Sequence, residues 1–138
     1  MFEAFSKRRR GALMLAGIAL LAVPAAAAAP SGVAALGKLQ KGRWQVRELD
    51  GAVSPANICL GNPEQLVRFA HRAGPGCELE ILHNGAAAAT VQYRCGARGF
   101  GHSAVRVETP RSVRIDTQGF ANGRPFSYKL EARRLGAC

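Results

Sequence analysis

Residues 112–131, SVRIDTQGFANGRPFSYKLE, contain the pattern that decides the fold. Val113 and Ile115 alternate with polar residues before the dipeptide Asn122-Gly123, and a second alternation of apolar and polar residues follows it. Because successive side chains of a β-strand point to opposite faces, each half predicts a strand with one buried and one solvated face. Asn-Gly favours a two-residue hairpin turn. The second strand has Phe126, Tyr128 and Leu130 inward, and the outward side chains of the pair are Arg114, Asp116, Ser127, Lys129 and Glu131.

The same two-residue period recurs from residue 43 onward. Its inward positions are Trp44, Val46, Leu79, Ile81, Val91, Tyr93, Val105 and Val107. Turn-forming residues separate these segments at Asn84-Gly85 and Thr109-Pro110-Arg111. Segments with one dry and one wet face are typical of antiparallel sheets. We therefore predict a mainly β fold, a curled antiparallel meander of roughly six to eight strands that is barrel-like or half-barrel.

One short α-helix is predicted to interrupt the meander. Asn62 is a good capping residue, Pro63 suits the first helical position, and Gln65 completes a capping-box pattern. The apolar stripe that follows consists of Leu66, Phe69, Ala70 and Ala73. Gly74 ends the helix, and Pro75 prevents its continuation. The helix should therefore begin at residue 62 or 63, stop at 74 and lie on one face or open end of the sheet.

The N-terminal segment has the composition of a cleavable secretion signal. Basic residues at 7–10 precede an apolar run at 11–23, and Pro24 and a string of alanines follow. Ala26 and Ala28 supply the small residues of a cleavage site, so we predict the cut after Ala28. An uncleaved anchor helix is disfavoured by Pro24, and a twin-arginine route lacks its usual polar and aromatic flank. The predicted organisation is a signal peptide at 1–28, a flexible lead-in at 29–38 and a single β-rich domain at 39–138.

The charge of the mature chain indicates anionic partners. Cleavage removes four basic residues and Glu3 from a chain of formal charge +10, which leaves +7. A basic surface attracts anions, which outside the cytoplasm are lipopolysaccharide, anionic phospholipid or acidic proteins. Chromosomal DNA is out of reach, so no nucleic-acid partner is expected. No transmembrane anchor is expected after cleavage, and simple solubility is the alternative explanation of the charge.

Four cysteines, Cys59, Cys77, Cys95 and Cys138, follow the predicted signal peptide. An even number of cysteines in an oxidising compartment predicts two disulfides. Their spacing lacks the paired knuckle of structural zinc sites and the C-x-x-C of thiol oxidoreductases. Of the three connectivities, the parity of the predicted hairpin favours Cys77 with Cys95, because both lie on the inward side of neighbouring strands. Cys59 then pairs with Cys138.

The residue types that most often carry catalysis or bind metals are not arranged for it. His71, His83 and His102 have no second ligand at a short spacing, so we expect three solvated surface imidazoles. The glycine-rich segment at 96–101 lies between predicted strands, whereas phosphate-binding loops precede a helix. Neither a Ser-His-Asp order nor a G-x-S-x-G motif is present. The sequence therefore predicts no catalytic residue, cofactor or metal.

Two sets of residues are candidates for binding. Arg98, Arg133 and Arg134 are candidate anion contacts. Trp44, Phe126 and Tyr128 either fill the core or line a ligand pocket between sheet and helix. The leading hypothesis is a non-catalytic envelope binding module that engages an anionic partner. The alternatives are a carrier or sensor of a small apolar ligand between sheet and helix, and an uncharacterised hydrolase.

Several landmarks resemble domain of unknown function family 3617. They are Gly42-Arg-Trp44, Cys59 followed by Pro63-Glu64, Cys77, Cys95 and the terminal stretch Ala132-Arg-Arg-Leu-Gly-Ala-Cys138. The resemblance covers roughly residues 39–138 and implies a small periplasmic or secreted protein of a Gram-negative bacterium, with disulfides and a β-rich fold. It implies no activity. The methionine-rich stretch that many members carry after the first strand is absent.

Overall fold

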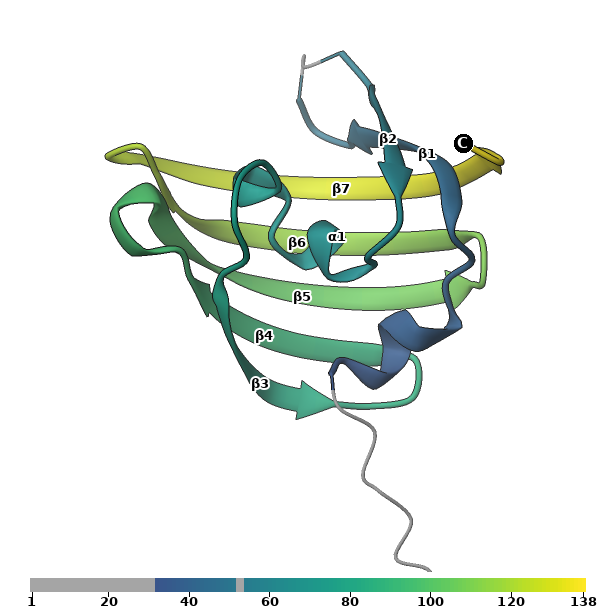
Figure 1. Ribbon diagram of the computed structural model, residues 1–138, viewed down its shortest axis with the longest axis horizontal. Coiled ribbons are helices and arrows are strands. Elements are labelled where there is room, and N and C mark those ends of the chain that lie inside the picture. The colour runs from purple at the N-terminus through teal and green to yellow at the C-terminus, as the bar shows by residue number, and fades with distance from the viewer. Residues whose placement is uncertain (1–31, 52–53) are drawn as a thin grey trace, which may run out of the picture.

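The computed structural model describes residues 32–51 and 54–138. The predicted signal peptide, its cleavage site and the first residues of the predicted lead-in lie outside the described residues. Within that part of the chain, seven strands form one open antiparallel sheet in the order β2-β1-β7-β6-β5-β4-β3 (Figure 1). Their bounds are β1 Gly42–Glu48, β2 Ala56–Leu60, β3 Glu78–Asn84, β4 Ala88–Arg94, β5 Gly99–Thr109, β6 Ser112–Ala121 and β7 Arg124–Gly136. The predicted mainly β, antiparallel fold is confirmed.

The first two strands lie at one edge of the sheet, and the third strand lies at the other edge. β3 to β7 form a continuous meander, and β1 and β2 form a hairpin whose first strand pairs with β7. The connection from β2 to β3 therefore runs from one edge of the sheet to the other and carries helical residues across one face (Figure 1). In the β6–β7 turn, Asn122 and Gly123 have φ angles of 52° and 75°, the left-handed conformation that tight hairpins use.

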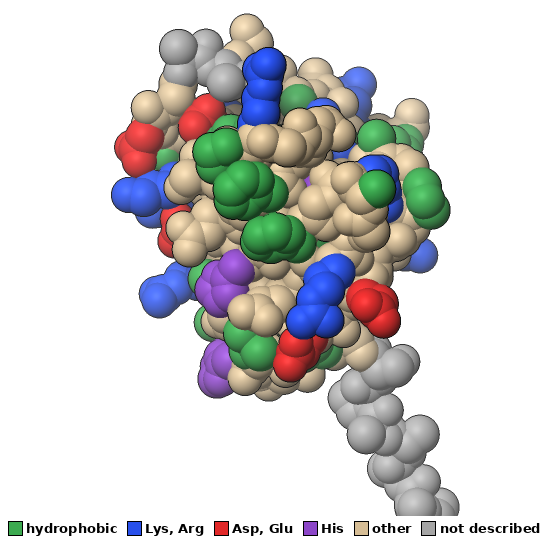
Figure 2. Space-filling model, turned by 90° about the vertical axis from the view of Figure 1, so that its left-hand side faces the viewer, with side chains coloured by type: hydrophobic (Ala, Val, Ile, Leu, Met, Phe, Trp, Pro, Cys, Tyr) green, Lys and Arg blue, Asp and Glu red, His purple; other side chains and the backbone are tan. Residues whose placement is uncertain are grey.

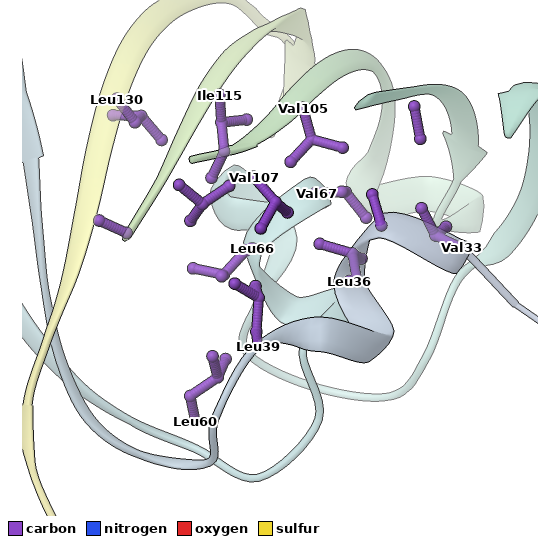
Figure 3. Packing of buried hydrophobic residues seen from close by; sticks show 14 of the residues in the cluster. Val33, Leu36, Leu39, Leu60, Leu66, Val67, Val105, Val107, Ile115 and Leu130 are labelled. Atoms are coloured by element: carbon purple, nitrogen blue, oxygen red, sulfur yellow. The ribbon is translucent and has the colours of Figure 1, made fainter. Parts of the chain in front are cut away.

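A layer of short helical segments covers one face of the sheet. It contains the 3₁₀ turn η1 (Ala34–Lys38), the helix α1 (Glu64–Val67) and the 3₁₀ turn η2 (Phe69–His71), and a further 3₁₀ turn, η3 (Gly96–Arg98), connects β4 to β5. Figure 3 shows how residues of this layer meet residues of the strands, namely Leu36, Leu39, Leu66, Val67, Val105, Val107, Ile115 and Leu130. All of these side chains are buried. The space between sheet and helical layer is therefore a packed apolar core.

The prediction of a flexible lead-in is wrong for its described part. Val33, Leu36 and Leu39 are at most 6% exposed and belong to the core cluster. Their spacing of three residues matches the period of a 3₁₀ helix, so one apolar side of this segment faces the sheet. The side chain of Asn84 fixes the segment from β3, because its Oδ1 accepts a hydrogen bond from the Ala34 N–H at 2.8 Å. The β-rich domain therefore begins before residue 39.

The predicted helix is shorter than expected. Asn62 Oδ1 accepts a hydrogen bond from the Glu64 N–H at 3.0 Å, which is a capping contact, but regular α-helix ends at Val67. Arg68 leaves the helical region with φ −116° and ψ 39°. At this point a tertiary partner replaces the helical hydrogen bond, since Ser103 Oγ on β5 donates to the Val67 carbonyl, and the Arg68 guanidinium donates locally to the His71 carbonyl. The chain then continues as η2 rather than as α-helix.

Both predicted disulfides are present. Sγ–Sγ bonds join Cys77 to Cys95 and Cys59 to Cys138. The hairpin register that led to the first pair is also confirmed, since Leu79 lies opposite Tyr93 and Ile81 opposite Val91 on β3 and β4. Cys59 on β2 is joined to a residue just beyond β7, so the second disulfide bridges strands that are separated by β1.

Trp44 is fully buried in the core, as predicted. The register places it opposite Ile58 of β2 and Arg134 of β7. Leu130 lies opposite Glu48, further along the strand pair. The indole N–H of Trp44 donates to the Gln40 carbonyl at 3.0 Å, which satisfies the one polar atom of this side chain.

Candidate functional site

Basic side chains gather at one end of the sheet, which we call the basic end. It comprises Lys41, Arg43, Arg111, Arg133 and Arg134. The backbone N–H of Arg134 donates to the backbone carbonyl of Arg111 at 3.0 Å. The side-chain Nε of Arg134 donates to the backbone carbonyl of Lys41 at 2.8 Å. Arg43 lies opposite Gly136 on β7. The start of β1, the β5–β6 turn and the end of β7 therefore meet at one place.

One acidic residue beside the basic end is already paired. Glu131 was predicted to face solvent, and it does lie on the face away from the core, yet it is only 3% exposed. Arg133 and Arg47 cover its carboxylate, and Arg47 Nη2 lies 3.0 Å from Glu131 Oε2. Hydrogen bonds lower the pKa of Glu131 below its ordinary value. The hydrogen bond from Arg133 has the larger effect and that from Arg47 the smaller. The carboxylate is thus charged and neutralises part of the charge of these two arginines.

Other members of the basic end keep their charge available. In the described part of the chain, Lys41, Arg43 and Arg111 take part in no ion pair. All three are exposed. These residues were not identified from the sequence, although each lies at a strand end or in a turn. Antiparallel pairing brings strand starts, strand ends and turns to the same end of the sheet, so the order of the strands was the missing information.

Two of the three predicted anion contacts, Arg133 and Arg134, belong to the basic end. Arg98 does not, because it lies in η3 at the other end of the sheet. Its Nη1 donates to the Ala73 carbonyl and its Nη2 to the Pro75 carbonyl, both at 2.7 Å. The guanidinium of Arg98 therefore fastens the loop that precedes the Cys77–Cys95 disulfide.

A cleft of about 810 Å³ lies at the end of the sheet opposite the basic end, and we call it the aromatic cleft. It is lined by residues of β4 to β7, among them Gln92, Arg94, Phe100, His102, Gln118, Phe120 and Pro125. The rings of Phe100 and Phe120 are 52% and 44% exposed, and their centroids are 5.6 Å apart. Figure 2 shows hydrophobic side chains gathered on this end of the molecule, beside basic, acidic and histidine side chains.

The aromatic candidates from the sequence separate in the structure. Phe126 lines the aromatic cleft, and Tyr128 lines a smaller cleft of about 380 Å³. Their rings stack with centroids 5.4 Å apart. Trp44, in contrast, lies in the filled core between sheet and helices.

The three histidines have different environments. His71 was predicted to be solvated, but it is 5% exposed. Its Nε2 lies 2.9 Å from the Arg98 carbonyl and its Nδ1 lies 3.3 Å from the Tyr93 hydroxyl. Since a carbonyl only accepts, the Nε2–H of His71 donates to the Arg98 carbonyl, and Nδ1 and the Tyr93 hydroxyl form a second hydrogen bond. His83 is exposed, and His102 is half-buried in the aromatic cleft.

Within residues 32–51 and 54–138, no three side chains of the metal-binding types come together as a cation site. None of the helices in the same ranges is long and apolar enough to cross a membrane. The chain matches no family model, no curated protein and no solved structure. The resemblance to domain of unknown function family 3617 therefore stays a prediction.

Proposed function

We propose that this protein is a non-catalytic binding module of the bacterial envelope that engages an anionic partner through the basic end. The observation that carries the proposal is the contact of Arg134 with both Lys41 and Arg111. It joins basic residues from three distant parts of the chain into one surface. Cationic side chains held at one end of a sheet favour phosphate and carboxylate groups, which guanidinium groups bind in a bidentate manner.

The distribution of ion pairs supports binding at the basic end rather than a general attraction by the net positive charge. Glu131 pairs with Arg133 and Arg47 and neutralises part of their charge, and Glu108 pairs with Arg114 at 2.9 Å. Lys41, Arg43 and Arg111 remain without an acidic partner among the described residues. Binding through exposed cations should weaken as salt increases, because dissolved ions screen the attraction between charges, with a screening length of about 8 Å at physiological ionic strength.

The test is binding to immobilised heparin and to vesicles that contain phosphatidylglycerol. The double variant Arg43→Glu/Arg111→Glu should elute from heparin at clearly lower salt than the parent and lose vesicle binding. Arg72→Glu/Arg124→Glu is the matched control, because it changes the net charge equally with exposed residues outside the basic end. It should elute close to the parent.

Equal losses in both double variants would mean that only net charge matters, and the basic end would then have no special role. Retention of the parent on heparin that is independent of salt would also contradict the proposal.

We also propose that the protein reaches the periplasm after cleavage behind Ala28. The support is the order of basic, apolar and small residues in the first part of the sequence. The intact mass of protein recovered from the periplasm should correspond to a chain that begins at Ala29. A membrane-bound species that retains Met1 would show that the segment is an anchor.

A further inference from the structure

We propose that the aromatic cleft is a second binding site and that its ligand is a neutral saccharide, whose pyranose rings stack on Phe100 and Phe120. This site is separate from the basic end, and the inference does not depend on the function proposed above. It rests on the arrangement of apolar, polar and charged side chains across four neighbouring strands.

The apolar part of the cleft is a straight row. The register places Arg94 opposite Phe100, Phe100 opposite Phe120, and Phe120 opposite Pro125. Neighbouring strands are about 4.8 Å apart, so the two rings and the proline form a strip roughly 10 Å long. This is close to the length of a disaccharide. The C–H groups on the face of a pyranose ring carry partial positive charge and suit the negative face of an aromatic ring.

A row of polar side chains runs beside the apolar row. Gln92 lies opposite His102, and His102 lies opposite Gln118, two residues along each strand from the first row. Side-chain amides both donate and accept hydrogen bonds, as sugar hydroxyls do. An acyl chain would offer these groups no partner, and polar groups that lose water without a new hydrogen bond oppose binding. The polar row therefore favours a saccharide over a lipid.

The charges at the β3 side of the cleft favour a neutral ligand. Glu78 lies opposite Arg94, and Glu80 lies opposite Gln92. The guanidinium of Arg94 therefore lies beside the two exposed carboxylates of Glu78 and Glu80. The net charge of these three groups is negative, which disfavours an anionic ligand. In the described residues Arg94 forms no ion pair, so its N–H groups are available to hydroxyl oxygens. The aromatic cleft and the basic end therefore select different ligands.

The backbone holds the two rings outward. Gly101 and Gly119 lie opposite each other, one residue along each strand from the two phenylalanines, and a Cβ at Gly119 would collide with the backbone at Phe100. On the inner side of the sheet, the ring of Tyr93 occupies the space beside Gly101. The rigid sheet thus presents two half-exposed phenylalanines side by side. Contiguous apolar surface of this kind, bordered by polar groups, is typical of binding sites.

The test is an NMR titration of ¹⁵N-labelled protein with three neutral hexasaccharides, cellohexaose, hexa-N-acetylchitohexaose and maltohexaose. At least one of them should shift the amide signals of Gly99, Gly101 and Gly119, with a Kd on the order of 1 mM. Phe120→Ala should weaken that binding by about tenfold or more, because a stacking surface is lost. Phe120→Tyr keeps the ring and should bind nearly as the parent does.

Leu82→Ala is the matched control, since Leu82 is also an exposed hydrophobic residue on the sheet but lies outside the cleft. It should leave the affinity unchanged. Spectra of each variant without ligand establish that it is folded. Absence of shifts with all three sugars at about 20 mM would overturn the proposal. Larger shifts of the same signals with laurate or with heparin, or unchanged affinity in Phe120→Ala, would also overturn it.

Discussion

The phenol ring of Tyr93 on β4 lies against Gly101, the residue directly opposite it on β5, in the space that a side chain at 101 would need. The same tyrosine contacts His71 with its hydroxyl, and the two ring centroids are 5.5 Å apart. Burial is the main cause that raises the pKa of Tyr93 above its ordinary value. The absence of a side chain at Gly101 therefore lets the Tyr93 ring pack beneath the aromatic cleft.

Gly101→Ala should lower the free energy of unfolding by about 1 to 3 kcal/mol, because the new methyl group overpacks the site and displaces Tyr93. Urea denaturation followed by circular dichroism measures this change. Gly136→Ala is the control within a strand, since a Cβ there meets no atom within 4 Å. If the two variants unfold at the same urea concentration, the close approach of Tyr93 to Gly101 does not constrain the fold.

Trp44→Ala should lower the free energy of unfolding by about 3 to 5 kcal/mol, because it removes a fully buried indole and leaves a cavity. Thermal and urea unfolding measured by circular dichroism test this, since the variant lacks tryptophan fluorescence. Leu135→Ala, at a position that is 46% exposed, should have little effect. A Trp44→Ala variant as stable as the parent would contradict the burial of the indole.

Glu131→Gln should reduce stability at neutral pH and much less in acid. The hydrogen bonds from Arg133 and Arg47 hold the pKa of Glu131 below its ordinary value of 4.5. A carboxyl whose folded-state pKa is lowered stabilises the protein fully above the unfolded pKa, and this contribution is lost as pH falls through the folded-state pKa. The difference in unfolding free energy between parent and variant should therefore shrink below pH 4.5.

Urea denaturation at a series of pH values provides that measurement. Glu80→Gln, an exposed substitution on β3, is the control for exchanging a carboxylate for an amide. A difference between parent and Glu131→Gln that is the same at every pH would show that the charge of Glu131 contributes nothing to stability.

Removal of either disulfide should destabilise the domain, and the longer loop should matter more. Loop-closure entropy gives about 3 kcal/mol for a loop of the size closed by Cys77 and Cys95 and about 4.5 kcal/mol for that closed by Cys59 and Cys138. Variants with both cysteines of one pair replaced by alanine, compared by urea denaturation, test the order. Peptide mapping without reduction should recover both pairs, and a fragment that joins Cys59 to Cys77 would refute the pairing.

Six of the seven described strands and their inward residues were predictable because the two-residue period is a property of neighbouring residues in the sequence, whereas β2 was not identified. The prediction that Glu131 is solvated failed even though its place on the outer face was correct. Its carboxylate is covered by Arg47, which is 84 residues away along the chain. The predicted helix failed for a related reason, since Ser103 on β5 binds the carbonyl of Val67 where the next helical hydrogen bond would form.

The sequence by itself determined six of the seven described strands, three hairpin turns and the disulfide pairs of this protein, because alternation, turn chemistry and parity act over a few residues. Only the tertiary structure decided the burial of His71, the packing of residues 33–39 and the make-up of the two candidate surfaces. The contact between Arg134 and Lys41 spans 93 residues of sequence, and the aromatic cleft depends on the registers of four strands. Such arrangements follow from the order of strands in the sheet, which no local pattern of residues specifies.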